Sequence, residues 1–158
     1  FTAALAVFQG VWMTAFVKTI VVFPGPWLMQ MLILAACCVS FTFVALAMSA
    51  HMASPEKASL LSIYLVGFQL PLSGVVLALP EFLVWVCRPV ITTYWSWGAY
   101  LSTLRNPGED ANRVFDAFRM TSDEWLPGPS LALAVLAVHA LLAAGLILWG
   151  CQRKRWDG

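Results

Sequence analysis

The chain has 158 residues, of which 61% are hydrophobic and only 11% are charged. A soluble domain usually carries about 45–50% apolar and about 25% charged residues, so this chain has too little polar surface to face water. The composition excludes a soluble enzyme, a disordered tail and a collagen-like fibre, and the net charge of +1 provides no basic surface for nucleic acid. The sequence therefore predicts an all-α integral membrane protein.

Long stretches without Asp, Glu, Lys or Arg predict four membrane-spanning helices. Such a stretch follows Lys18 for 37 residues, Lys57 for 23 residues and Glu124 for 28 residues. About 20 apolar residues cross a bilayer as a helix, so each stretch holds at least one span. Pro24-Gly25-Pro26 divides the first stretch, because this tripeptide ends a helix and favours a tight turn. The predicted spans cover about 1–22, 27–50, 58–79 and 129–150.

The segments between the spans indicate an orientation. Ser54-Pro55-Glu56 combines an N-cap hydroxyl, a proline at the first helical position and an acid in the first turn, which predicts a helix start. The cluster Arg153–Arg155 predicts a cytoplasmic C-terminus by the positive-inside rule, in the plasma (inner) membrane. Counting back through four spans leaves residues 80–127 external. Because the chain starts at Phe1, inside an apolar segment, we expect it to be a piece of a longer polypeptide.

The external stretch combines several short apolar and aromatic segments. Residues 80–88 are apolar but too short to cross, which is typical of a re-entrant or interfacial segment. Four Tyr and Trp residues between 94 and 100 predict a position at the headgroup level. Apolar positions at helical spacing over 111–118 predict an amphipathic helix on the outer surface.

Polar residues inside the third span are the first candidates for function. Gln69, Pro71, Ser73 and Gly74 interrupt an otherwise apolar helix, and both a kinked backbone and a buried amide need partners in protein or in a cavity. Two interpretations stay open, a bent helix that lines a pathway and a kinked helix whose glutamine joins two helices. Ser73 with His139 also allows an intramembrane serine hydrolase, although a structural hydrogen bond explains His139 equally well.

Beyond these single residues, the order of elements over 43–101 carries a resemblance. A span ends at Ser49-Ala50, the next carries Gln69–Gly74, and an apolar re-entrant stretch leads to Pro89–Tyr94. In this order the chain resembles the C-terminal part of an ABC-2-type transporter membrane domain, as in ABCG-like exporters.

The resemblance implies that the four spans are the third to sixth helices of a six-helix domain. Two such domains pair, and ATP-binding domains, fused or separate, drive them between inward- and outward-facing states. ATP and Mg would therefore bind a partner domain and no cofactor would bind this chain. The implied substrate path consists of Phe68, Gln69, Leu72, Ser73 and Val76, with Glu81 and Trp85 in a re-entrant cap.

The sequence thus predicts the membrane part of an ATP-driven exporter, with no catalytic residue and no metal site of its own. The four cysteines lie in no metal-ligand spacing. The first alternative is a non-transporting membrane scaffold with an external aromatic docking surface. The second is the serine hydrolase.

Overall fold

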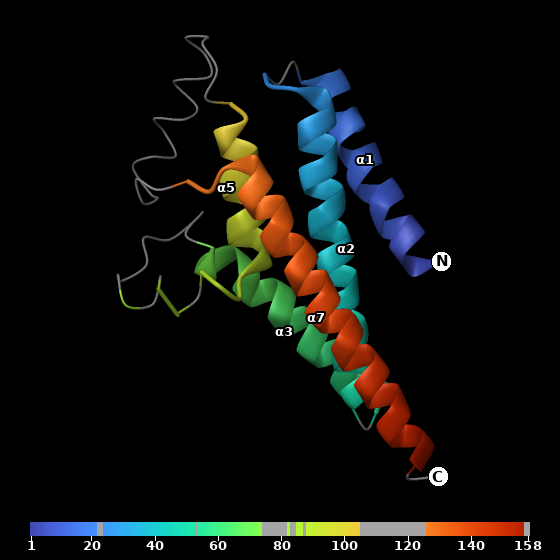
Figure 1. The fold of residues 1–158 in the computed structure, drawn as a ribbon. Helices are drawn as coiled ribbons and strands as arrows, with labels where there is room; N and C mark the ends of the chain where they lie inside the picture. The colour runs from blue at the N-terminus through green and yellow to red at the C-terminus, as the bar shows by residue number, and fades with distance from the viewer. Residues whose placement is uncertain are drawn as a thin grey trace.

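The computed structural model describes residues 1–21, 24–52, 54–73, 82, 85, 86, 88–104 and 126–156. Within this part of the chain every regular element is a helix (Figure 1). The helices are α1 (Thr2–Ile20), α2 (Trp27–His51), α3 (Pro55–Leu72), α5 (Thr92–Ser102) and α7 (Pro129–Trp156). The predicted all-α class is confirmed. The amphipathic helix predicted over 111–118 lies outside the described residues.

Three helices are long and apolar enough to cross a membrane. These segments are Thr2–Ile20, Trp27–His51 and Pro129–Arg153, with mean hydropathies of 1.4, 2.5 and 2.6. Each agrees with a predicted span to within three residues at either end. The other predicted span, 58–79, coincides only in part with α3, and its last residues lie outside the described part of the chain.

The predicted turn between the first two spans is confirmed. α1 ends at Ile20 and α2 begins at Trp27, and Gly25 between them adopts φ 104°, a conformation that other residues rarely take. Lys18 is buried, and its Nζ donates to the Gly25 carbonyl at 2.7 Å and lies 5.3 Å from the centre of the Trp27 ring. The lysine therefore reaches the turn itself instead of extending freely to the headgroups.

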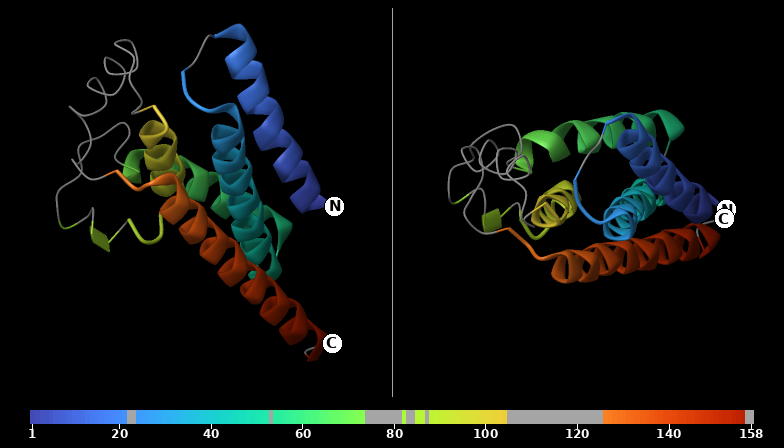
Figure 2. Two further views of the ribbon diagram at one scale, coloured as in Figure 1. Left: turned by 45° about the horizontal axis from the view of Figure 1, so that its top comes forward. Right: turned by 90° about the horizontal axis from the view of Figure 1, so that it is seen from above.

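The centre of the bundle is α2, which packs most extensively against α7 and α1 (Figure 2). A Cβ added at Gly10 of α1 would lie 2.6 Å from the backbone of Ala35, so the two helices approach closely because this position has no side chain. On the other side of α2, Ser40 Oγ donates to the Leu136 carbonyl of α7 at 2.8 Å. Small and hydroxyl residues thus set the helix contacts, as is common in membranes.

Helix α5 packs inside this arrangement through its small residues. Ser96, Gly98 and Ala99 are buried, and Ala99 lies in a core cluster with Ile33 of α2 and Ala132 of α7. The Cys37 thiol of α2 donates to Ser96 Oγ at 3.2 Å. Trp95 of α5 packs against this core cluster, and the predicted position of the α5 aromatic side chains at the headgroup level stays a prediction.

Helix α3 begins as predicted and packs less tightly than its neighbours. The Ser54 hydroxyl accepts a hydrogen bond from the Lys57 amide at 3.4 Å, with Pro55 at the first helical position. α3 contacts α2 and α5. It rises from the end of the bundle where α2 ends, and α5 continues toward the opposite end (Figure 1). Together the two shorter helices run alongside the long α2.

Candidate functional site

The residues predicted to form the substrate path do not share one surface. Gln69 is only 5% exposed, whereas the adjacent Phe68 is 61% exposed. Leu72 is half-buried at the end of α3. Ser73 is buried, and its hydroxyl donates to the Leu70 carbonyl at 2.7 Å.

Of the residues predicted to form the rest of the path and its cap, Val76 and Glu81 lie outside the described residues. Trp85 is described, and most of its side chain is exposed. The structure thus leaves the predicted re-entrant cap untested.

Gln69 joins α3 to the start of α5. Its Oε1 accepts a hydrogen bond from the backbone amide of Thr93 at 3.1 Å. Thr93 is the second residue of α5, and amides in the first turn of a helix have no acceptor within the helix. The glutamine therefore caps α5 from a residue 24 positions earlier in the chain. This bond supports the interpretation that Gln69 joins two helices.

The segment that leads into α5 is held by side chains of two helices. Trp95 Nε1 donates to the Arg88 carbonyl at 2.7 Å, and His139 Nε2 lies 2.7 Å from the Pro89 carbonyl. A carbonyl can only accept, so Nε2 of His139 carries the proton in this contact. Its buried Nδ1 has no hydrogen-bond partner among the described residues.

These contacts occur near the middle of α7. His139 lies ten residues after Pro129 and fourteen before Arg153, which is about 15 Å and about 21 Å along the helix. Non-helical backbone at membrane depth must be buried in protein or line a cavity, because the lipid offers no hydrogen bonds. The side chains of Trp95 and His139 supply hydrogen bonds to this non-helical segment, and Gln69 bonds the first turn of the helix that follows it.

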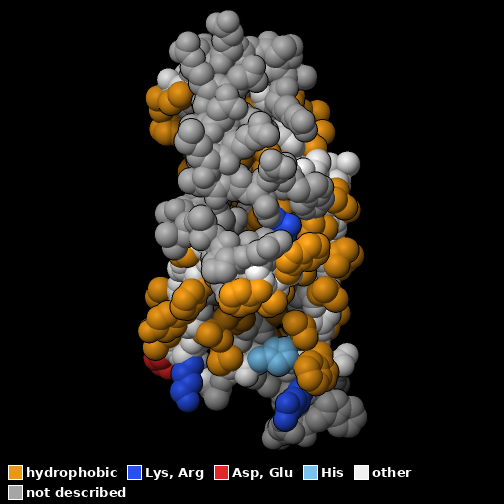
Figure 3. Space-filling model, turned by 90° about the vertical axis from the view of Figure 1, so that its left-hand side faces the viewer, with side chains coloured by type: hydrophobic (Ala, Val, Ile, Leu, Met, Phe, Trp, Pro, Cys, Tyr) orange, Lys and Arg blue, Asp and Glu red, His pale blue; other side chains and the backbone are white. Residues whose placement is uncertain are grey.

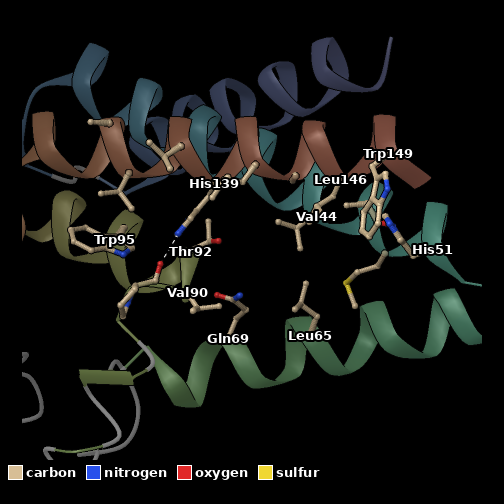
Figure 4. Close-up of a pocket in the computed structure, with 18 of the residues that line it drawn as sticks. Val44, His51, Leu65, Gln69, Val90, Thr92, Trp95, His139, Leu146 and Trp149 are labelled. Carbon is tan, nitrogen blue, oxygen red and sulfur yellow. Dashed lines mark hydrogen bonds between the residues drawn. The ribbon is translucent and has the colours of Figure 1, made fainter. Parts of the chain in front are cut away.

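Next to the start of α5 lies a large pocket between α2, α3, α5 and α7 (Figure 4). Its volume is about 860 Å³, within the range of about 300–1,000 Å³ typical of small-molecule sites. Most of its wall is aliphatic. Residues that line it are Val44, Ala47, Met48, His51, Met52, Leu65, Gln69, Pro89, Val90, Thr92, Trp95, Ala134, Val135, Val138, His139, Leu142, Ala143, Leu146 and Trp149.

Polar groups gather toward the two ends of this pocket. Gln69, Thr92 and His139 lie together near the start of α5, and His51 lies beside Trp149 at the other end (Figure 4). The rings of His51 and Trp149 have centroids 5.5 Å apart. Between these ends the wall is apolar, so the pocket suits an elongated hydrophobic molecule with at least one polar end.

The polar side chains near this pocket bond backbone groups. Among the described residues, no group of three His, Cys, Asp or Glu side chains lies close enough together to hold a metal ion. Ser73 and His139, the pair considered for a serine hydrolase, each bond a backbone carbonyl. These bonds agree with the structural interpretation of His139.

Sequence reasoning identified Gln69 but missed the pocket around it. Thr92 and Trp95 were predicted only as part of an interfacial stretch, and the α7 wall was predicted only as a span. The spacing of Val135, Val138, Leu142 and Leu146 follows one face of a helix, but an all-apolar span shows the same spacing on every face. Comparison of the chain with models of known families, with curated proteins and with solved structures finds no match.

Proposed function

We propose that the chain is the membrane-spanning part of an ATP-driven exporter that pairs with a second membrane domain. The single observation that supports this proposal is the non-helical segment 88–91, which is held by hydrogen bonds and leads into α5 beside a large apolar pocket. Discontinuous helices around a site near the middle of the membrane are typical of transporters, because the break lets backbone and polar side chains reach a substrate. A packing scaffold has no need of such a break.

In this proposal the two neighbouring residues of the predicted path have different roles. Gln69 faces the pocket and positions the start of α5. Phe68 is exposed on the outer side of α3 and would face the second membrane domain across the path between the two domains. Movement would be rigid-body rocking of α3 against the more tightly packed α2, α5 and α7.

Energy for this movement would come from a partner. ATP and Mg would bind an ATP-binding domain, fused or separate, and this chain would contribute the moving helices. We further propose that the domain resides in the plasma (inner) membrane with its C-terminus cytoplasmic and residues 80–127 on the external side, from which the segment before α5 and α5 itself re-enter the bundle. A cysteine introduced at Asn106 should then react with an impermeant reagent on intact cells, whereas one at Gly158 should react only after the cells are opened.

The central test measures the distance between α3 and α7 across the pocket. Spin labels at Leu60 of α3 and Leu148 of α7, both exposed, report this distance in the full assembly with native cysteines replaced. Adding Mg-ATP and vanadate should shift the distance distribution. A matched pair at Leu32 of α2 and Leu131 of α7, also exposed, spans two helices that pack directly and should not shift.

Other outcomes favour the alternatives. An α3–α7 distance that ATP leaves unchanged contradicts the exporter and favours the membrane scaffold. Phe68→Ala should alter substrate-stimulated ATPase activity or export, and wild-type behaviour would remove Phe68 from the path. Loss of a hydrolytic activity in both Ser73→Ala and His139→Ala would favour the serine hydrolase.

A further inference from the structure

The pocket has the shape of a slot that runs along α7. Its α7 wall extends from Ala134 to Trp149, and fifteen helical steps of 1.5 Å make this wall about 22 Å long. Half of a bilayer's hydrocarbon core is about 15 Å thick. α3 packs on α2 and α5, and the pocket lies between α3 and α7. The slot is therefore long enough for one acyl chain of a single leaflet.

One end of this slot is basic. His51 at the end of α2 and Trp149 of α7 line it there. Arg153 lies four residues after Trp149 on the same face of α7 and is exposed. Lys57 is exposed in the first turn of α3, which begins at the same end of the bundle, with the Glu56 carboxylate beside it. We name His51, Lys57 and Arg153 the basic end.

The space-filling view shows the same arrangement from one side. Two basic side chains, an acidic one and a histidine lie at the lower end of this face, apolar side chains lie directly above them, and one more basic side chain is visible higher up (Figure 3). Tryptophan is enriched where hydrocarbon meets headgroups, and Trp149 lies at this boundary between the apolar wall and the basic end. The surface thus has the polarity of a phospholipid, with an apolar part and an anion-attracting part.

We propose that this slot is a binding site for an anionic phospholipid. One acyl chain lies in the slot between α3 and α7, and the phosphate lies at the basic end. Basic pockets between transmembrane helices attract anionic headgroups because the phosphate charge is complementary to Lys and Arg side chains. The bound chain fills the space that direct α3–α7 packing would otherwise fill.

Charge argues against a second copy of the chain in the same slot. Two copies in one membrane have the same orientation, so their basic ends lie at the same depth. Packing them together there would bring like charges close together, which is unfavourable. A phospholipid with a negative headgroup brings the opposite charge. This proposal does not depend on transport and applies equally to a scaffold.

Native mass spectrometry of the full chain in detergent can test the site with phosphatidylglycerol and phosphatidylcholine as probes. Phosphatidylglycerol should bind more tightly. Replacing Lys57 and Arg153 by Gln should lower phosphatidylglycerol affinity about fivefold for each residue and leave phosphatidylcholine affinity unchanged. Both side chains are exposed, so these variants leave the helix packing intact.

A second pair of variants tests the slot itself. Val138 lines the slot and is 51% exposed, whereas Leu141, one helical turn away, is 72% exposed and lies outside the lining. Val138→Trp should lower the affinity for both lipids, and the matched control Leu141→Trp should not. Equal binding of the two lipids by the wild-type chain, or equal effects of the two tryptophans, would overturn the proposal.

Discussion

Replacing Gln69 by leucine tests whether this residue holds the start of α5 against α3. Leucine has a similar size but no acceptor, so it would fill the same place without bonding the Thr93 amide. The amide lies in the first turn of α5 and has no acceptor within the helix. Because Gln69 is 5% exposed, little water can replace the lost oxygen. The variant therefore isolates one hydrogen bond at the centre of the candidate site.

The expected cost follows from the burial of this bond. A buried donor that loses its partner costs about 1–3 kcal/mol. Loss of a side-chain cap at a helix N-terminus costs about 0.5–2 kcal/mol, and the two figures describe the same bond and are not summed. A cost of about 1–3 kcal/mol corresponds to local opening of the start of α5 about 5 to about 150 times more often.

Hydrogen exchange at the Thr93 amide in the reconstituted full chain measures this opening. Protection of the Thr93 amide should fall by a factor of about 5 to about 150 in Gln69→Leu. Gln69→Glu retains an acceptor oxygen and should keep most of the protection. Phe68→Leu, at the exposed neighbouring position, should change protection less than about twofold. Unchanged protection in Gln69→Leu would refute the idea that this side chain holds α5.

Two further predictions concern other parts of the bundle. Gly10→Ala should destabilise the α1–α2 contact by about 1–3 kcal/mol, because its Cβ would lie 2.6 Å from the Ala35 backbone, as measured by unfolding of the full chain in mixed detergent. The matched control Gly67→Ala, with open space around its Cβ, should be neutral or stabilising, and equal effects of both would contradict this explanation. At the start of α3, hydrogen bonds from its own backbone amide and from Ser54 lower the pKa of the Glu56 carboxyl. The stabilisation of the folded state by these hydrogen bonds is therefore fully present above the ordinary pKa of a glutamate. It is lost as the pH falls through the lowered pKa of Glu56. Ser54→Ala should raise this pKa in an NMR titration, and an unchanged titration would show that the Ser54 bond is absent.

The features that could be predicted from the sequence depend on residues close together in the chain. The turn at Pro24-Gly25-Pro26 needs only the conformational limits of proline and glycine. Ser54 caps α3 because a hydroxyl stands just before a proline and an acid. Three spans follow from the absence of charge over lengths that match a bilayer. Each of these signals is local. The structure confirms the turn and the cap, and it has three helices long and apolar enough to cross a membrane.

The features that could not be predicted depend on contacts between distant segments. Gln69 bonds Thr93, 24 positions away, and His139 bonds Pro89, 50 positions away. An apolar span has no polar side by which its inner face can be recognised, so the α7 wall of the pocket left no signal in the sequence. The packing of α5 through Ser96, Gly98 and Ala99 left a weak signal in the sequence, because small residues often mark close helix contacts in membranes.

Gln69 and His139, the polar residues inside the bundle, therefore have a structural explanation that does not require contact with a substrate. Polar groups in a membrane point to function by default. Here the Gln69 oxygen already bonds the Thr93 amide in the first turn of α5, and the proton on His139 Nε2 already bonds the non-helical carbonyl of Pro89. Loss of activity in a variant of either residue would consequently not show contact with a substrate unless the start of α5 stays in place. Selectivity for a bound molecule is better tested at Val138, Leu146 and Leu65. These residues line the pocket, and their apolar side chains form no hydrogen bond to the backbone.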